Sequence, residues 1–204
     1  LDVKGRSGLK AAGRKWLCIG TLFIVTVVLI ILSTPVFYLN DDVTMRSILS
    51  GAYTGTPDGH AVYMQYPLGG VLAILYRVVS FMPWMELFFA GSVFACMVFF
   101  AESFESWVRG VLAAIAIYIP FVLYTHYTLI AALLAATACF LLAKGDKGIR
   151  SGVLLLLAFL IRGQIGLLSI PFVLCAMVFR VVLMLASERK RECIRKGKWL
   201  AVLA

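Results

Sequence analysis

Long apolar segments dominate the pattern of hydrophobic and polar positions in this chain. The first runs from Trp16 to Tyr38, roughly 23 residues, and a helix of that length crosses about 30 Å of hydrocarbon. Polar and charged stretches separate it from the apolar segments that follow. These are Trp84 to Phe100, Val108 to Tyr124, Leu129 to Ala143, Ser151 to Ile161 and Gly166 to Ala186. The pattern predicts an all-α fold, a polytopic bundle of transmembrane helices.

The region between the first two spans allows two topologies. Asn40 to Tyr66 is polar and rich in Gly, Thr and Pro, whereas Pro67 to Val79 is apolar but short for a span and contains Arg77. If Pro67 to Val79 crosses the membrane, the basic loop Lys144 to Arg150 falls outside, against the positive-inside rule. If it lies along the outer interface as an amphipathic helix, the rule is satisfied. We therefore favour the second topology.

Composition and charge position narrow the class of protein. The chain is 62% hydrophobic and 14% charged, with a mean hydropathy of +0.98, too apolar for a soluble domain of this length. The net charge of +9 does not indicate a nucleic-acid partner, because fourteen of the nineteen Lys and Arg residues lie in three short clusters beside apolar runs. These clusters are Lys4 to Lys15, Lys144 to Arg150 and Arg189 to Lys198. Such clusters are typical of cytoplasmic loops, so we expect a multi-pass protein of the cell membrane with a cytoplasmic N-terminus.

Cysteine spacing and the chain ends add two expectations. The five cysteines are scattered without metal-ligand spacing, so no disulfide is implied. The chain begins at Leu1 and stops at Ala204 inside a new apolar run. We expect residues 1–204 to form a single transmembrane domain, the N-terminal part of a longer protein.

Two adjacent carboxylates, Asp41 and Asp42, follow the first span. At the start of a helix, either can accept hydrogen bonds from the backbone N–H groups of the next turn, and a negative charge suits that end of the helix dipole. Alternatively, one of them is a general base or a metal ligand at the membrane surface. Arg46 lies four residues after Asp42, which is the spacing of an ion pair within one helix.

Other polar side chains are expected on the same outer side. Arg162 interrupts an apolar hairpin, which is costly unless its guanidinium snorkels, pairs with an acid such as Asp41 or Asp42, or binds a ligand. Arg77 can snorkel to lipid phosphate, and Glu86 can pair with an outer arginine.

The remaining candidates have equally plain structural interpretations. Asp58 and His60 lie in TPDGH, which is ordinary turn sequence, although Asp and His also bind substrates and metals. His126 lies between tyrosines in YTHYT, which is typical of an interfacial aromatic belt. Gln164 can hydrogen-bond a ligand or the backbone at a break in a helix.

The order of these features resembles the start of the GT-C superfamily of integral-membrane glycosyltransferases, which includes protein O-mannosyltransferases and aminoarabinose transferases. The shared features are a first span, the pair Asp41–Asp42 at its outer end, a helix, a Gly/Pro-containing loop and a second helix that begins with Pro67. The sequence-specific part covers about Asn40 to Trp84. The resemblance implies an outer loop, residues 40–83, with two juxtamembrane helices near Val43 to Ala52 and at Pro67 to Val79.

The resemblance also implies a chemistry. A sugar would pass from a polyprenyl-phosphate donor to an envelope glycan, lipid or protein acceptor, at a bacterial membrane. Asp41 or Asp42 would be catalytic, and Arg162 and Arg77 would bind the donor phosphate. Contacts with substrate would come from Asp58, His60, His126 and Gln164. Several relatives carry a second acid in a later outer loop, where this chain has YTHYT, so His126 is the candidate substitute; a divalent metal stays open.

Two other classes of function remain. A transporter or flippase of lipid-linked saccharides also needs polar groups on the outer face, but alternating access predicts polar residues within several spans. The predicted spans here are nearly free of charge. In a non-catalytic membrane protein, the Asp41–Asp42 pair would only cap a helix.

Overall fold

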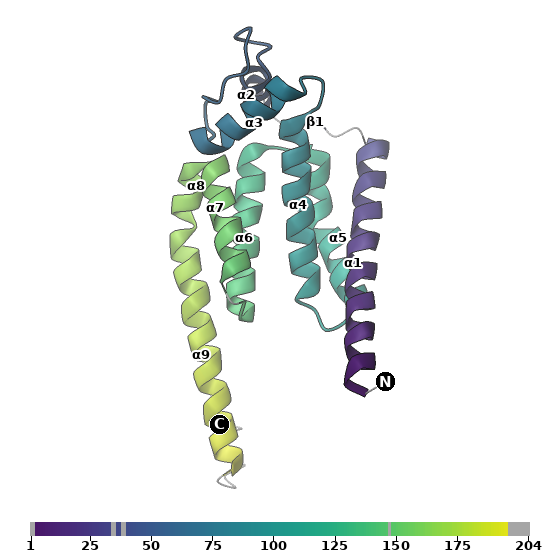
Figure 1. Cartoon of the computed structure of the whole chain (residues 1–204). Coiled ribbons are helices and arrows are strands. Elements are labelled where there is room, and N and C mark those ends of the chain that lie inside the picture. The colour runs from purple at the N-terminus through teal and green to yellow at the C-terminus, as the bar shows by residue number, and fades with distance from the viewer. Residues whose placement is uncertain (1–2, 34–35, 38–39, 147, 196–204) are drawn as a thin grey trace.

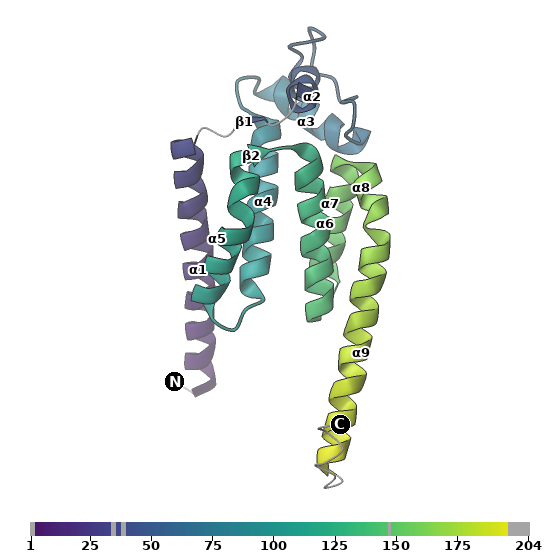
Figure 2. The same ribbon diagram turned by 180° about the vertical axis from the view of Figure 1, so that it is seen from behind.

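The computed structural model describes residues 3–33, 36–37, 40–146 and 148–195. Its long helices run alongside one another as a bundle (Figures 1 and 2). These are α1 (Val3–Ser33), α4 (Trp84–Glu102), α5 (Trp107–Leu123), α6 (Tyr127–Lys144), α7 (Ile149–Ile161) and α9 (Ile170–Arg195). The shorter α2 (Asn40–Ser50), α3 (Tyr66–Val78) and α8 (Gly163–Leu168) lie at one end, where β1 (Val36–Phe37) and β2 (Tyr124–Thr125) form a short parallel pair. The prediction of an all-α bundle is confirmed.

Four stretches of helix are long and apolar enough to cross a membrane. They are Gly13–Leu32, Trp84–Glu102, Tyr127–Lys144 and Gly163–Glu188, whereas α5 and α7 are apolar but shorter. Large side chains on α9 point away from the protein, with Phe172 68% exposed and Val178 63% exposed. Exposed apolar surface of this extent is compatible with a membrane protein, because lipid tails can cover it.

The first span ends earlier than predicted. The helix stops at Ser33, and its membrane-length segment at Leu32, rather than at Tyr38. Val36 and Phe37, inside the predicted span, form the strand β1 instead of a continuing helix. Residues 34, 35, 38 and 39 lie outside the described part of the chain.

The two helices expected in the first loop are present at the end of the bundle. α3 covers almost the predicted range and has Pro67 in its first turn, where the missing N–H costs nothing. α2 begins at Asn40 rather than near Val43, so both aspartates lie in its first turn, and it ends before Gly51, whose φ of +81° suits glycine. Figure 1 shows α3 across the helix ends rather than among the long helices.

The two ends of the bundle differ in the elements and in the charged residues that lie there. We call the end with α2, α3 and α8 the loop end. At the opposite end lie the first turns of α1, the α4–α5 and α6–α7 turns and the C-terminal part of α9 (Figures 1 and 2). The residues of the three basic clusters that the structure describes lie at this end, which we call the basic end. This common placement is the one that the favoured topology requires.

A close backbone contact holds the first loop against α3. A Cβ atom built on Gly59 would lie 2.7 Å from Gly70 Cα, and one built on Gly69 would collide with the backbone of Gly59. Farther along the loop, Gln65 N donates to Leu160 O at the end of α7, with an N–O distance of 2.8 Å. The loop is therefore packed against both α3 and α7 above the bundle.

Candidate functional site

Asp42 is the most enclosed carboxylate at the loop end, with an exposed fraction of 0%. Its Oδ1 accepts a hydrogen bond from the backbone N–H of Tyr127 at 3.0 Å, and its Oδ2 lies 2.8 Å from His126 Nδ1. His126 is the N-cap position of α6 and has no capping side-chain bond of its own. Asp42 therefore supplies the cap for α6 from another helix. The expectation that it caps the helix it begins is corrected in this respect.

His126 differs from a belt residue in its surroundings. It is only 8% exposed and bonded to Asp42, so the interpretation as an interfacial aromatic belt residue is wrong. A buried polar ring needs partners, and this one has a carboxylate. The pair fixes the start of α6 beneath α2, and a direct contact of His126 with substrate stays a prediction.

Asp41 has different surroundings from its neighbour. One residue farther back along α2, its side chain leaves the helix about 100° away from that of Asp42. It is half-buried, and within the described residues its carboxylate makes no hydrogen bond or ion pair. It lies within electrostatic range of the Tyr127 hydroxyl. Asp41 is thus the carboxylate of the pair that keeps its oxygens available.

Arg162 lies where α7 gives way to α8, in an extended conformation with φ −150° and ψ 102°. Its Nη1 donates to Thr128 Oγ1 and lies 3.5 Å from the Tyr127 hydroxyl, and its Nη2 donates to Gln164 Oε1 at 3.4 Å. Gln164 thus bonds the residue at the helix break. No carboxylate lies within ion-pair distance of Arg162 in the described ranges, so the alternative in which Arg162 pairs with Asp41 or Asp42 is wrong.

Two tyrosines that the sequence did not single out complete this cluster. The rings of Tyr63 and Tyr127 are stacked, with centroids 5.3 Å apart and an angle of 8° between planes. The Arg162 guanidinium carbon lies 5.6 Å from the Tyr63 centroid and 5.2 Å from the Tyr127 centroid. The aromatic faces therefore stabilise a cation that lacks an acidic partner. Only the aromatic content of the loop and of YTHYT hinted at these residues.

The remaining loop candidates form a separate local structure. Asp58 Oδ1 accepts from the backbone N–H of His60 at 3.0 Å and lies 2.7 Å from His60 Nδ1. These hydrogen bonds hold the pKa of Asp58 below its ordinary value. Arg77 Nη2 donates to Pro57 O at 2.8 Å. The turn interpretation of TPDGH is confirmed, and in the described residues no hydrogen bond joins Asp58 or His60 to the Asp42–His126 pair. Roles of these residues and of Arg77 toward substrate stay predictions.

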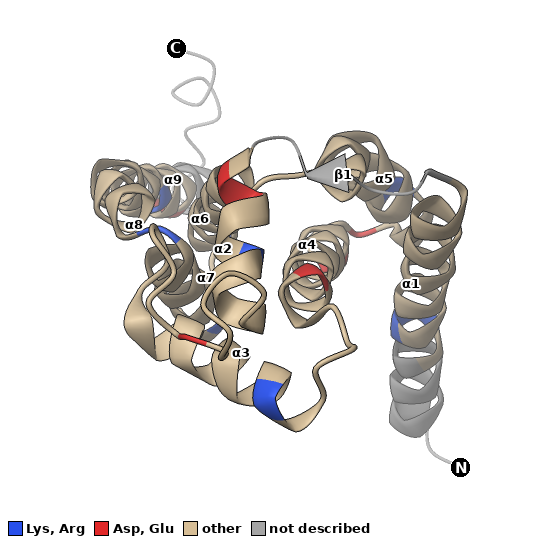
Figure 3. Ribbon diagram, turned by 90° about the horizontal axis from the view of Figure 1, so that it is seen from above, with Lys and Arg blue, Asp and Glu red and all other residues tan. Residues whose placement is uncertain are grey.

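Arg46 also has another partner than predicted. Its Nε lies 2.9 Å from Glu86 Oε1, so it joins α2 to α4 instead of pairing with Asp42 within its own helix. The expectation that Glu86 pairs with an arginine on the same side is confirmed. Figure 3 shows α2 and α4 from above, next to each other at the loop end.

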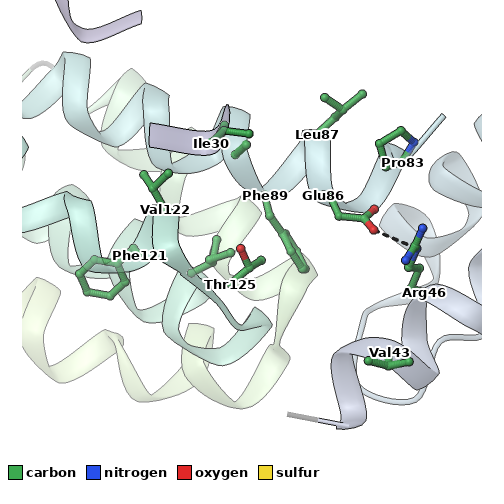
Figure 4. Close-up of a pocket in the computed structure, with 12 residues that line it drawn as sticks. Ile30, Val43, Arg46, Pro83, Glu86, Leu87, Phe89, Phe121, Val122 and Thr125 are labelled. Atoms are coloured by element: carbon green, nitrogen blue, oxygen red, sulfur yellow. Dashed lines mark ion pairs between the residues drawn. The ribbon is translucent and has the colours of Figure 1, made fainter. Parts of the chain in front are cut away.

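This ion pair borders an apolar pocket of about 540 Å³ (Figure 4). Ile30, Phe89 and Val122 are among its walls, together with Val43 of α2. Val43 and Asp41 are about 200° apart around α2, so the pocket and Asp41 lie on different flanks of that helix. Walls of this kind suit a hydrocarbon chain better than a sugar.

A metal site would need several ligands close together. In the part of the chain that the structure describes, no three His, Cys, Asp or Glu side chains are grouped in this way. Asp42 and His126 are adjacent, but they bond to each other.

The chain gives no match to protein-family models, to curated proteins or to solved structures.

Proposed function

We propose that the protein is a bacterial membrane glycosyltransferase that moves a sugar from a polyprenyl-phosphate donor to a cell-envelope acceptor at the loop end of the bundle. In this proposal the loop end faces outward and the basic end faces the cytoplasm. The proposal rests on the different surroundings of the two aspartates. Asp42 is buried and both its oxygens are engaged, whereas Asp41 is half-buried and has no described bonding partner.

Asp41 is the proposed base. It accepts the proton of the acceptor hydroxyl while that oxygen forms a bond to the anomeric carbon of the donor sugar. The bond from the anomeric carbon to the phosphate oxygen breaks, and the bonding electrons leave with the polyprenyl phosphate. The proton then passes from Asp41 to water. Asp42 does not react; it positions Asp41 by holding α2 on the start of α6.

Arg162 is the proposed partner of the leaving phosphate. Its positive charge lacks a carboxylate within the described residues, and Tyr63 and Tyr127 hold it in place. A fixed cation stabilises charge that develops on the leaving group. Tyr127 links the two parts of the proposed site, because Arg162 Nη1 lies 3.5 Å from its hydroxyl and its backbone N–H donates to Asp42, the neighbour of Asp41.

The test is sugar transfer in bacterial membranes that contain the full chain, supplied with radiolabelled polyprenyl-phosphate sugars. We expect Asp41→Asn to reduce kcat at least about 100-fold, because a positioned base contributes about 10² to 10⁴, while the melting temperature stays unchanged. Arg162→Lys should also reduce kcat, because lysine cannot keep the same contacts with Thr128 and Gln164.

The control is Thr44→Asn, an exposed position on the same helix, which should leave transfer intact. Full transfer by Asp41→Asn at equal expression would refute the role of Asp41. Movement of the labelled lipid across the membrane without sugar transfer would favour a flippase instead.

A further inference from the structure

The basic end carries a second pocket that the proposed function does not use. It has a volume of about 210 Å³ and lies between α1, the end of α4 and the start of α5. Its polar lining comes from Arg14, Lys15 and Glu102, and Phe104 and Trp107 add aromatic walls. We refer to it as the basic pocket.

Charge in the basic pocket is unbalanced. Glu102 Oε1 lies 3.1 Å from Lys15 Nζ, and Glu102 Oε2 accepts from Arg150 Nη1 at 2.9 Å. Both oxygens of the single carboxylate are therefore engaged by cations. Arg14 lines the same pocket as a third cation, is exposed, and makes no hydrogen bond or ion pair within the described ranges. Among the lining residues and their ion-pair partners, Arg14, Lys15 and Arg150 stand against the single carboxylate of Glu102, so the pocket has a net positive charge.

The position of the basic pocket along the helix axes indicates that its ligand comes from the lipid headgroup layer. The candidate spans Gly13–Leu32 and Trp84–Glu102 both reach their ends at this pocket, so Arg14, Lys15 and Glu102 belong to the terminal turns of two spans. In a bilayer, the ends of spans lie at the level of the lipid headgroups. Trp107, in the first turn of α5, is of the type that gathers at that level.

We propose that the basic pocket binds the headgroup phosphate of an anionic phospholipid from the adjacent leaflet. Arg14 and Lys15 attract the phosphate, and Phe104 and Trp107 contact the glycerol and the upper part of the acyl chains. Basic pockets between helices at the cytoplasmic side of membrane proteins are suited to such headgroups. The inference needs no sugar transfer, so it stands or fails separately from the proposed enzyme.

The experiment uses Trp107 as the reporter. The other tryptophans of residues 1–204 are removed in the full chain by the substitutions Trp16→Phe, Trp84→Phe and Trp199→Phe. Any tryptophan outside residues 1–204 is also replaced by phenylalanine. The protein is reconstituted in phosphatidylcholine vesicles that contain either brominated phosphatidylglycerol or the same fraction of brominated phosphatidylcholine. We expect the brominated phosphatidylglycerol to quench Trp107 more strongly. Equal quenching by the two lipids would overturn the proposal.

A matched pair of variants separates a site from diffuse attraction. Arg14→Gln should lower the preference for phosphatidylglycerol about fivefold, the effect of one basic residue near an anionic surface. Arg109→Gln removes the same charge at the same end, from an exposed position outside the pocket lining, and should change the preference much less. An equal effect of both variants would show attraction to the whole surface and would refute a site at Arg14.

A last arm distinguishes the lipid from a free anion. Inorganic phosphate is added at constant ionic strength, so that screening does not change. We expect Trp107 quenching by brominated phosphatidylglycerol to persist, because the lipid is held by the pocket and the bilayer together. Loss of the quenching would mean that the pocket prefers a soluble anion, which would overturn the lipid assignment.

Discussion

The side chains of Asp41 and Asp42 leave α2 on different sides, so each has its own chemistry. Asp42 completes the hydrogen bonding at the start of α6, and Asp41 does not. From the sequence, capping of their own helix was one interpretation of these aspartates and a catalytic or metal-binding role was the other; in the structure Asp42 caps α6 instead. The sequence did not show which aspartate would cap, because the helix that is capped begins 85 positions farther along the chain than Asp42.

Loss of the Asp42 carboxylate should destabilise the protein. In Asp42→Ala the backbone N–H of Tyr127 and Nδ1 of His126 lose their acceptor in a buried place, which costs about 1–3 kcal/mol for each unsatisfied group. In Asp42→Asn one amide oxygen can still accept from Tyr127, so the loss should be smaller. Thermal unfolding in detergent measures both. A melting temperature for Asp42→Ala equal to that of Asp41→Ala would contradict the capping role.

The partners of Arg162 could not be predicted from residue types. An arginine among apolar residues predicts pairing or ligand binding, and a carboxylate is the usual partner. Here the partners are hydroxyl groups, an amide and two aromatic faces. Tyr63 and Thr128 become its neighbours only because the first loop folds back over the start of α6.

The loop-end helices are held by specific polar contacts in addition to buried apolar side chains, among them Met45 and Leu49 of α2 and Leu72 of α3. α2 is attached to α6 through Asp42 and to α4 through the Arg46–Glu86 pair. Arg46 and Glu86 are 50% and 29% exposed, so this ion pair contributes little, about 0–1 kcal/mol. The cap is therefore the stronger of the two attachments. α3 in turn depends on the close approach of the loop.

Two adjacent glycines in α3 give a sharp test of that approach. Gly69→Ala should destabilise the protein, because its Cβ would meet the Gly59 backbone, which cannot move without the loop. Gly70→Ala is the matched control, since its Cβ would meet only the Tyr66 ring at 3.9 Å, and alanine improves helix propensity by about 1 kcal/mol. Thermal unfolding should therefore move in opposite directions for the two variants. Equal shifts would mean that the loop does not pack on α3.

The arrangement of the whole bundle predicts which end faces the cytoplasm and which end faces outward. Thr54 lies in the first loop at the loop end, and Lys144 lies at the basic end; both are exposed. In a full-length protein without native cysteines, we expect Thr54→Cys to react with a membrane-impermeant maleimide on intact cells. Lys144→Cys should react only after the cells are permeabilised, because the basic end is expected in the cytoplasm. Labelling of Lys144→Cys on intact cells would reverse the proposed orientation and remove the outer-face site.

The sequence by itself determined the elements of this protein. Apolar length specified the long helices, because a span must be as long as the hydrocarbon layer is thick, and Pro67 together with a short apolar run specified α3. The distribution of Lys and Arg predicted which ends of the helices lie together. Helix starts and ends differed from prediction by a few residues, as at Ser33, where α1 ends before the strand β1, and at Gly51, whose positive φ follows the end of α2.

Only the tertiary structure decided the partners of the polar side chains. Asp42 with His126, Arg46 with Glu86, and Arg162 with Tyr63 each join segments that are distant in the sequence. The physical reason is that apolar burial depends on period and length, which a linear pattern contains. A hydrogen bond, in contrast, depends on distances of about 3 Å and on direction, which exist only once the helices have packed and the loop has folded over them.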